Sequence, residues 1–578
     1  MDSELKNNTI IPPIIGIDLG TTMSAVSIVQ EGGVKIFKNP LGEYLTPSVV
    51  AYSKEDDQII TGRLAKDATV LSPLSGVSLF KREMGLEVKK KFGPKSASPI
   101  ELSSYIINSL RRDAENELKI AIDSCVVTVP AYFNEPERQA TKAACELAGL
   151  QVKRILNEPT AAAISFGMHN IEKECTFAVI DLGGGTFDVC IMEIFNGILE
   201  VKSVAGDSQL GGEDFTDTLA ALVLSKAGLQ KESLTESDIV QLRRKAELAK
   251  RTLSLWSSTQ LNLSFSNIGE LTVSIKLEEA NDCWQELIKR MFAPCLSAIR
   301  GSGVSKEELS AVLMVGGATR MPCVVEFVTK VFGISPSQDP EPDLIVVKGA
   351  AIQAGLISKD KFVQDYVITD IASHSLGINA CREIGGEDKS GYFWPIIHRN
   401  TVIPTSRACI FHTIVRNQRS INIEVYEGEG RKVAENTKIG EFKVSGIPSG
   451  EPREAISVRF TFDLSGLLEV EVTVLETKKV YLEVFNHLGI EFSDKQKAAY
   501  MDNIANLKKD PLTLPRYKDL LNRASLLWSD LREGDREKID IAIEIFESAM
   551  DTRTPKYIER AYKELSEICK LYDSGERW

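Results

Sequence analysis

IIGIDLGTTMS, residues 14–24, and AVIDLGGGTFD, residues 178–188, are two copies of one sequence pattern. Each copy has an apolar run, then Asp-Leu-Gly, then small and hydroxyl-bearing residues. The apolar runs predict buried strands, and the glycines that follow predict tight turns. A strand and turn that occur twice in one chain indicate two related lobes, and we expect the lobes to face a single nucleotide.

The residue types in the two turns suit the binding of phosphate and a metal ion. Glycine lets backbone N–H groups approach a phosphate closely because it has no Cβ, and threonine adds a hydroxyl donor. An aspartate at the end of each strand is placed to hold Mg²⁺, which usually keeps several of its waters. The predicted phosphate-binding residues are Gly20, Thr21, Thr22, Gly183, Gly184, Gly185 and Thr186, and the predicted Mg²⁺ residues, acting mainly through water, are Asp18 and Asp181.

Two further segments extend this candidate site. Residues 315–322, VGGATRMP, form a third glycine turn after an apolar strand, and we interpret it as a wall for the nucleoside. A helix predicted over 240–256 places Glu247, Lys250, Arg251 and Ser254 on one face. Taken alone, that polar face would be an ordinary solvated helix face; beside a nucleotide it could hold adenine and ribose. Neither GxxxxGK[ST] nor GxGxxG occurs, which excludes the two best-known nucleotide loops.

Hydrophobic periodicity divides the chain into segments. Residues 10–364 alternate short Val/Ile-rich runs with helical patterns, which is typical of an α/β fold. Strands are expected at 14–17, 125–129, 178–180, 190–194 and 311–315, and helices at 101–118 and 135–148. Residues 372–485 alternate with period two and predict an antiparallel sandwich or barrel. Residues 493–573 return to helical periodicity and predict a short bundle, with Pro511 and Pro515 interrupting its first helix.

The stretch 365–371 separates the two halves. Its centre, Val367-Ile368, is apolar, and acidic residues stand on both sides of it. It reads either as a buried edge strand or as an interdomain linker, and its position favours the linker.

Bulk properties exclude several classes of protein. The chain of 578 residues carries 68 basic and 81 acidic residues, a net charge of −13, and shows no basic stripe, so we expect no nucleic-acid partner. We expect neither a signal peptide nor a membrane span. Ten cysteines without a CxxC pair predict reduced thiols and a cytoplasmic location. The five dispersed histidines suit packing or surface roles better than zinc binding.

Eight motifs in a fixed order resemble the DnaK-like seventy-kilodalton heat-shock chaperones, and most closely their shorter HscC-type branch. They are IDLGTT (17–22), VTVPAYFNEPERQATKAA (127–144), ILNEPTAAA (155–163), DLGGGTFD (181–188), LGGEDF (210–215), AELAKRTLS (246–254), VGGATRMP (315–322) and KGAAIQAG (348–355). The resemblance covers nearly the whole chain. It implies an actin-like ATPase domain of two ribonuclease-H-type lobes (1–364), a linker (365–371), a β-sandwich that binds peptide (372–485) and a helical lid (486–578).

The resemblance also implies roles for single residues of the ATPase domain. ATP or ADP with Mg²⁺ would be the cofactor, and K⁺ is a further candidate. Lys66 would position the attacking water, with Glu158, Asp181 and Thr186 as the other catalytic residues. Pro130 and Arg138 would relay the nucleotide state. The remaining nucleotide contacts would come from Gly211, Gly212, Glu213, Glu247, Lys250, Arg251, Ser254, Gly316, Gly317, Arg320 and Asp343.

For the second half, the resemblance implies an allosteric linker and partners. Val367 and Ile368 would couple the domains, although Tyr366 and Thr369 replace the more usual aliphatic residues. The peptide-binding residues would be Ile378, Cys381, Phe411, Ile414, Ile421 and Ile423. By periodicity alone, Ile421 suits a core position better. Unfolded or client polypeptides would be the substrates. A J-domain co-chaperone would contact Arg154, Asn157 and Asp365, while the need for a nucleotide-exchange factor stays open.

Two other classes share the phosphate loops. A sugar kinase of the same superfamily would transfer phosphate to a hydroxyl and would not need residues 372–573. An ATP-bound holdase would bind one dedicated partner without hydrolysis, and the intact Lys66, Glu158 and Asp181 argue against it.

Overall fold

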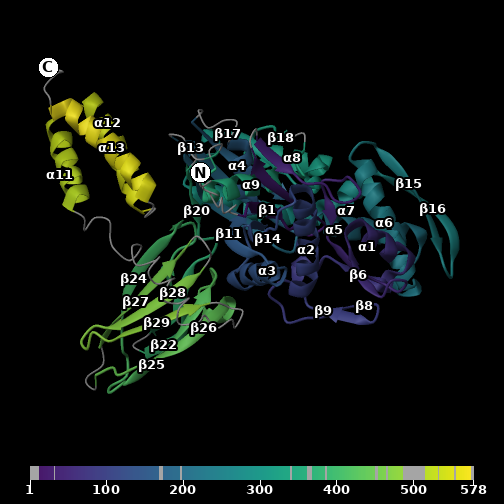
Figure 1. The fold of residues 1–578 in the computed structure, drawn as a ribbon, viewed down its shortest axis with the longest axis horizontal. Helices are drawn as coiled ribbons and strands as arrows, with labels where there is room; N and C mark the ends of the chain where they lie inside the picture. Colours follow the sequence, from purple (N-terminus) through teal and green to yellow (C-terminus); the bar gives the residue numbers. More distant parts are fainter. Residues whose placement is uncertain are drawn as a thin grey trace, which may run out of the picture. The chain divides into compact units, whose positions relative to one another are not determined.

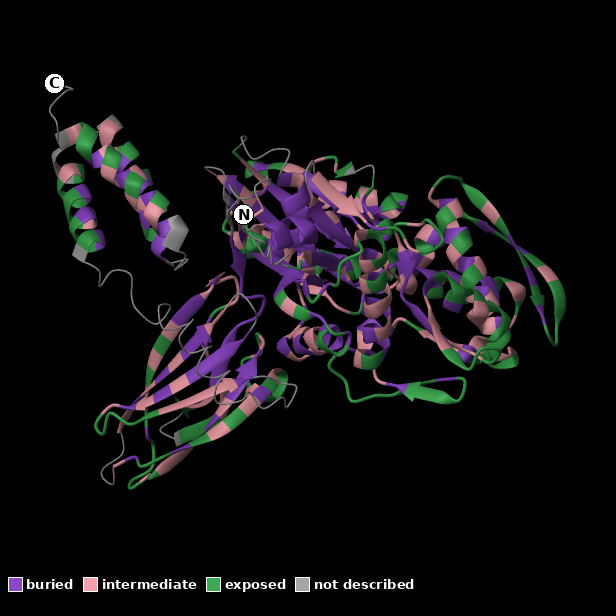
Figure 2. Cartoon of the chain, in the orientation of Figure 1, coloured by how far each residue is buried: buried purple, intermediate pink, exposed green. Residues whose placement is uncertain are grey.

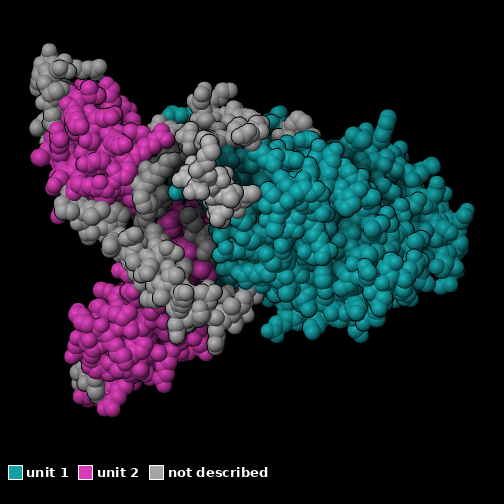
Figure 3. Space-filling view, viewed as in Figure 1, with its two compact units in different colours: residues 1–368 teal, residues 369–578 magenta. Residues whose placement is uncertain are grey.

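The computed structural model describes residues 12–30, 33–167, 174–195, 198–338, 341–360, 363, 367–384, 387–448, 454–463, 467–485, 515–531, 533–551 and 555–573. The chain forms two compact units, residues 1–368 and 369–578, which Figure 3 shows in different colours. The division falls inside the predicted linker, 365–371.

Two large sheets of the same design are at the centre of the first unit (Figure 1). The first has the order β11-β10-β1-β2-β3, and the second has the order β18-β17-β12-β13-β14-β19. In each, the first strand of a meander (β1 or β12) pairs antiparallel with the next strand and parallel with a strand far along the chain (β10 or β17). The duplication read from the two glycine turns is therefore a duplication of the whole sheet.

The strands of these sheets match the predicted ones to within a few residues. The first sheet contains β1 (Ile14–Asp18), β2 (Met23–Gln30), β3 (Gly33–Ile36), β10 (Ser124–Val129) and β11 (Gln151–Asn157), and β4 (Thr46–Pro47) pairs with β2. The second contains β12 (Cys175–Leu182), β13 (Phe187–Phe195), β14 (Ile198–Asp207), β17 (Leu309–Val315), β18 (Ser337–Gln338) and β19 (Val367–Ile368). Smaller sheets contain β5 (Val49–Ser53), β6 (Gln58–Thr61), β7 (Gly76–Ser78), β8 (Lys90–Phe92), β9 (Lys95–Ala97), β15 (Ser258–Phe265) and β16 (Gly269–Lys276).

Helices of the first unit connect and cover these strands. They are α1 (Gly62–Leu71), α2 (Pro99–Leu118), α3 (Glu135–Leu147), α4 (Glu158–Gly167), α5 (Gly212–Ala227), α6 (Glu236–Leu253), α7 (Leu277–Ser302), α8 (Pro322–Phe332) and α9 (Ile345–Ser358). Helix α3 begins with a capping box, in which Asn134 Oδ1 accepts from the Glu137 N–H at 3.0 Å and Glu137 Oε2 accepts from the Asn134 N–H at 2.8 Å.

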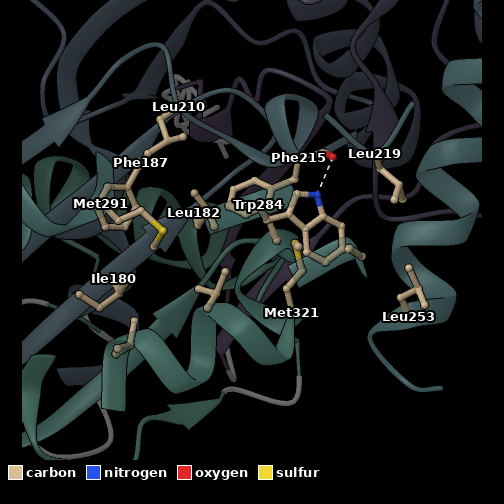
Figure 4. Close-up of a cluster of buried hydrophobic side chains, with 14 of the residues drawn as sticks. Ile180, Leu182, Phe187, Leu210, Phe215, Leu219, Leu253, Trp284, Met291 and Met321 are labelled. Atoms are coloured by element: carbon tan, nitrogen blue, oxygen red, sulfur yellow. Dashed lines mark hydrogen bonds between the residues drawn. The ribbon is translucent and has the colours of Figure 1, made fainter. Parts of the chain in front are cut away.

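The core of each lobe lies against its sheet, whose strands are largely buried in Figure 2. In the second lobe, Trp284 of α7 is 1% exposed and meets Phe215 of α5 edge to face, with ring centroids 5.9 Å apart. Its indole Nε1–H donates to the Phe215 carbonyl at 2.9 Å, so the buried polar atom has a partner (Figure 4).

The described part of the second unit contains a β sandwich and three helices. One sheet has the order β22-β21-β25-β26 and the other β24-β27-β28-β29, and apolar side chains from both form one core. Their strands are β21 (Leu376–Ile384), β22 (Glu387–Ile397), β24 (Thr405–His412), β25 (Ser420–Glu427), β26 (Thr437–Ser445), β27 (Ala455–Phe462), β28 (Leu468–Val474) and β29 (Val480–Phe485); β20 (Asp370–Ile371) and β23 (Val402–Ile403) pair separately.

The helices α11 (Pro515–Asp530), α12 (Glu533–Asp551) and α13 (Pro555–Asp573) pack on one another. Pro515 is the first residue of α11, a position where proline is well tolerated because its missing N–H would have no helical partner. The residues before it lie outside the described ranges, so its predicted role as an interruption stays a prediction. Pro511 lies outside the described residues.

Candidate nucleotide site

The two glycine turns lie directly against each other. A Cβ on Gly184 would come 2.4 Å from Thr22 Cγ2, and a Cβ on Gly185 would come 2.6 Å from Thr21 Cγ2. The LGGEDF turn joins them, because the N–H of Gly212 donates to the Gly183 carbonyl at 2.9 Å. The structure thus brings together three of the segments predicted to bind phosphate.

Buried carboxylates surround one buried lysine beside these turns. The Lys81 ammonium donates to Glu158 Oε1 at 2.6 Å, and the two residues are 2% and 9% exposed. Asp18, at the end of β1, accepts from the Thr128 hydroxyl of β10 at 2.9 Å. Asp188 accepts from the Tyr132 N–H at 3.1 Å. Glu158, at the start of α4, and Asp181, near the end of β12, are buried as well.

These carboxylates are hard to ionise without a further cation. Burial, and then the nearby Glu158, raise the pKa of Asp18 to about 7. The same two causes raise the pKa of Asp188 to about 8 and hold the pKa of Asp181 well above its usual range. Lys81 opposes all three shifts.

The donor set fits Mg²⁺ bound together with a nucleotide. Three buried carboxylates and the half-buried Asp18 share one lysine, and a divalent cation would neutralise the excess negative charge. Among the described residues, no group of three or more His, Cys, Asp or Glu side chains is close enough to hold a metal ion alone. Mg²⁺ would therefore take much of its shell from water and phosphate oxygens, with Asp18 and Asp181 nearby. The ion would supply neutralisation of the phosphate charge.

The structure surrounds Lys66 with other charged groups than these carboxylates. Lys66 lies on α1, and the charged groups that act on it are Arg251, Arg63, Glu247 and Glu213. Partial burial, and then the two arginines, lower its pKa. The lysine beside the carboxylates is Lys81, from the Phe80–Glu83 turn of 3₁₀-helix.

Helix α6 presents the polar face that the sequence predicted. The Lys250 ammonium donates to the Gly212 carbonyl at 2.6 Å and lies 2.6 Å from Glu247 Oε2. Burial would raise the pKa of Glu247, but Lys250, Thr216 and Arg251 hold it below its usual range. The Ser254 hydroxyl donates to the Lys250 carbonyl at 3.2 Å. Glu213, also expected at the nucleotide, lies 3.1 Å from Arg243.

The third glycine turn lies against the second. Gly316 has φ +84°, and a Cβ there would come 2.5 Å from the Leu182 carbonyl oxygen and 2.9 Å from Asp181 Oδ1. Gly317 lies beside Asp343, since its Cβ would be 3.2 Å from Asp343 Oδ1. Arg320 Nη2 is 3.4 Å from Asp343 Oδ2, which brings these predicted residues together.

Two residues that sequence reasoning missed complete the site. Asp188 closes the DLGGGTFD motif, and its place at the end of a recognised motif was a usable signal. Arg82 follows Lys81; its Nε–H donates to the Gly185 carbonyl at 3.0 Å, and its Nη2–H donates to Asp214. Arg82 therefore ties a segment of the first lobe to two turns of the second.

The predicted relay residues connect to Glu158 through their neighbours. Arg138 Nη2–H donates to Asn157 Oδ1 at 2.6 Å and to the Ala131 carbonyl at 3.0 Å, next to Pro130. Asn157 directly precedes Glu158. A chain of contacts thus joins Pro130 and Arg138 to the carboxylate that Lys81 holds.

The residues expected to meet a J-domain lie mostly inside the first unit. Arg154 is 6% exposed and Asn157 is 1% exposed, and Arg154 Nη1–H donates to Gln353 Oε1 at 3.0 Å. This burial contradicts an exposed docking surface made by these two side chains. Asp365 lies outside the described residues. Val367 and Ile368 form β19, which pairs in parallel with Ile198 and Leu199 of β14, so the backbone is an edge strand at this point.

In the sandwich, the predicted peptide-binding residues differ in exposure. Ile378 and Ile423 are buried at 4% and 2% and belong to the core. Phe411 and Ile421 are partly buried against that core. Cys381 is partly exposed and Ile414 is 42% exposed. Only some of this set is accessible in the described conformation.

The first unit is a duplicated α/β unit whose glycine turns face each other, and a β-rich unit follows it. This arrangement defines a class of multidomain protein with a candidate phosphate-binding site. The family model described as Hsp70 protein matches residues 14–513, and the chain belongs to the Hsp70 family. It is therefore an ATP-dependent chaperone of the kind that hydrolyses ATP with Mg²⁺ and acts on client polypeptides with co-chaperones. Among the described residues, no helix is long and apolar enough to cross a bilayer.

Proposed function

We propose that this chain hydrolyses ATP at the Lys81–Glu158 centre and uses the nucleotide state to control binding of extended apolar peptide segments by residues 372–485. The observation that carries the proposal is the pair of facing glycine turns next to four carboxylates, three of them buried, and one buried lysine. Phosphoryl transfer to water needs positioning and charge neutralisation more than covalent chemistry, and this arrangement supplies both.

Roles follow for the residues of the site. Lys81 neutralises charge that develops on the transferred phosphate, and Glu158, held by Lys81, orients the attacking water. Asp18, Asp181 and Asp188 lie around the position of the ion, and Thr21, Thr22 and Thr186 donate to phosphate oxygens. Lys66 belongs with the face of α6 that carries Glu247 and Arg251, where it borders the nucleoside.

In the proposed peptide site, a bound segment contacts Phe411, Ile421 and Ile414. An extended peptide offers backbone hydrogen bonds, and burial of one aliphatic side chain contributes roughly 1.5–3 kcal/mol. Such weak, broad recognition suits a chaperone. Kinship with the HscC-type branch, a cytoplasmic location and stimulation by a J-domain protein are further parts of the proposal.

The test measures ATP hydrolysis by the full chain with and without an aliphatic peptide. We expect release of ADP and inorganic phosphate, faster with peptide, and no phosphorylated sugar when sugars are supplied. Transfer of phosphate to a sugar would replace the proposal with a kinase.

A second experiment separates a general chaperone from a dedicated holdase. Thr186→Ala slows hydrolysis and should hold clients long enough for isolation, because Thr186 is buried in the second phosphate turn. We expect many unrelated polypeptides in the eluate. A single partner bound equally by the unmodified chain would contradict the proposed cycle.

A further inference from the structure

The hairpin of β21 and β22 carries a cluster of aromatic rings and arginines beside the predicted peptide-binding residues. Trp394 of β22 stands directly across from Ile378 of β21, so the two share a face of the sheet. Trp394 is 41% exposed and meets Phe411 edge to face, with ring centroids 6.2 Å apart and an angle of 82°. An exposed tryptophan therefore extends the apolar surface assigned to peptide.

Two guanidinium groups lie over these rings. The Arg382 guanidinium carbon is 5.8 Å from the ring centroids of both Trp394 and Tyr392, and that of Arg431 is 5.7 Å from the Tyr392 centroid. Among the described residues, Arg382 and Arg431 have no ion pair and no side-chain hydrogen bond. A guanidinium stacked on a ring keeps the N–H groups at its edge available for a carboxylate.

The register of the hairpin gathers positive charge on this face. Lys389 stands directly across from Arg382. The nearest acidic residues of the hairpin, Glu383 and Asp388, are opposite each other one position further along. Strand alternation turns those two to the other face.

We propose that this aromatic-arginine cluster (Arg382, Tyr392, Trp394 and Arg431) selects client segments that carry a carboxylate next to an aliphatic core. The aliphatic residues contact Phe411 and the exposed face of Trp394, and an adjacent Asp or Glu lies against the edges of Arg382 and Arg431. The inference rests on the proposed peptide-binding function and adds a charge preference to it.

The experiment measures binding of fluorescent octapeptides to the full chain with ADP. The peptides share a central run of three leucines and differ at one flanking position, which is Asp, Asn or Lys. We expect affinity in the order Asp, Asn, Lys, with Asp and Asn about three- to fivefold apart, which is the range for an exposed ion pair. The difference should shrink at about 1 M salt, because exposed charges are screened there.

Variants test whether the aromatic-arginine cluster causes the preference for the Asp peptide. The double variant Arg382→Gln with Arg431→Gln should bind all three peptides alike, at the affinity of the unmodified chain for the Asn peptide. Lys479→Gln is the matched control, because Lys479 also lies over a ring, that of Tyr481 at 4.8 Å, on the other sheet. It should leave the preference unchanged.

The outcomes separate this inference from the function on which it rests. Equal affinity for the Asp and Asn peptides in the unmodified chain overturns the charge preference and leaves peptide binding intact. A uniform loss for all three peptides in the double variant also overturns it, since that result indicates a structural role. Failure to bind any of the peptides overturns the proposed function as well.

Discussion

Lys81 is the residue on which the nucleotide site depends most. Its ammonium is almost fully buried, touches Glu158, and opposes the rise in pKa of three aspartates. A buried cation among carboxylates is strongly coupled to all of them, and an exposed lysine is not. The distinction between Lys81 and Lys66 is therefore one of position, because the residue type is the same.

Lys81→Met should lower the rate of ATP hydrolysis on the order of a hundredfold, the usual effect of removing one group that stabilises transition-state charge. Lys66→Met, the matched control, should change nucleotide affinity more than the hydrolysis rate. Single-turnover hydrolysis gives the rate, and titration with labelled ADP gives the affinity and shows that the variant is folded. Equal loss of rate in both variants would return the catalytic role to Lys66.

The raised pKa of Asp188 predicts that the stability of the chain depends on pH. An unfolded aspartate has a pKa near 3.9, whereas burial raises the pKa of folded Asp188 to about 8. Between these values the folded state binds more protons than the unfolded state, so the free energy of unfolding falls as pH rises and levels off above about pH 8. Urea unfolding of the chain without nucleotide and Mg²⁺, from about pH 5 to about pH 9, measures this slope. Asp188→Asn should reduce it, and an unchanged slope would contradict the assignment.

At the scale of elements, the contact between the phosphate turns depends on glycine. Gly184→Ala would press a methyl group against Thr22, and such overpacking typically costs about 1–3 kcal/mol. Gly183→Ala is the control in the same turn, because its Cβ would meet nothing closer than the Thr186 carbonyl oxygen at 3.9 Å. Thermal unfolding of the chain without nucleotide should show a lower midpoint for Gly184→Ala only. Similar midpoints for both variants would mean that the turns separate at little cost.

A second prediction at this scale concerns the pairing of strand β19 with β14. A proline at position 368 removes the backbone N–H and is poorly tolerated within a sheet ladder, so Ile368→Pro should break the pairing with β14. We expect basal ATP binding to persist and stimulation of hydrolysis by peptide to be lost. Ile368→Leu, which keeps the N–H, is the control. Hydrogen exchange of the segment should rise in the proline variant, and normal stimulation despite that rise would exclude a coupling role for the pairing.

Much of the fold could be predicted because its elements have strong periodicity. In β27 and β28, alternating residues such as Val458, Phe460 and Val470 are buried, as the period-two pattern of residues 372–485 predicts. The predicted helical segment likewise buries residues at helical spacing, among them Ile539 and Phe546. Trp528 of α11 is 40% exposed, with the Arg536 guanidinium stacked on its ring, because a large amphipathic side chain can sit at the edge of a buried face. The role of Lys81 could not be read from periodicity, since a short turn brings it to partners that lie far away in sequence.

For the whole molecule, the proposed function gives the nucleotide to one unit and the peptide to the other. ATP in place of ADP should weaken peptide binding by the full chain about tenfold, within the range that coupling between two sites usually spans. Residues 369–578 alone should bind peptide with an affinity that no nucleotide changes, because the nucleotide site residues all lie in the other unit. Fluorescence anisotropy of one labelled peptide measures both. A nucleotide effect on the fragment would place a second nucleotide site there.

The edge of the sheet at β14 has a consequence beyond coupling. A strand that is added to a sheet edge binds mainly through backbone hydrogen bonds, and its side chains matter less. The edge that pairs with Val367 and Ile368 should therefore also bind other extended segments of similar length. A short peptide that copies residues 365–370 would compete with the chain's own strand for this edge. Such a decoy would uncouple the molecule while leaving both the nucleotide turns and the sandwich unoccupied, which makes the edge a target for inhibition separate from either binding site.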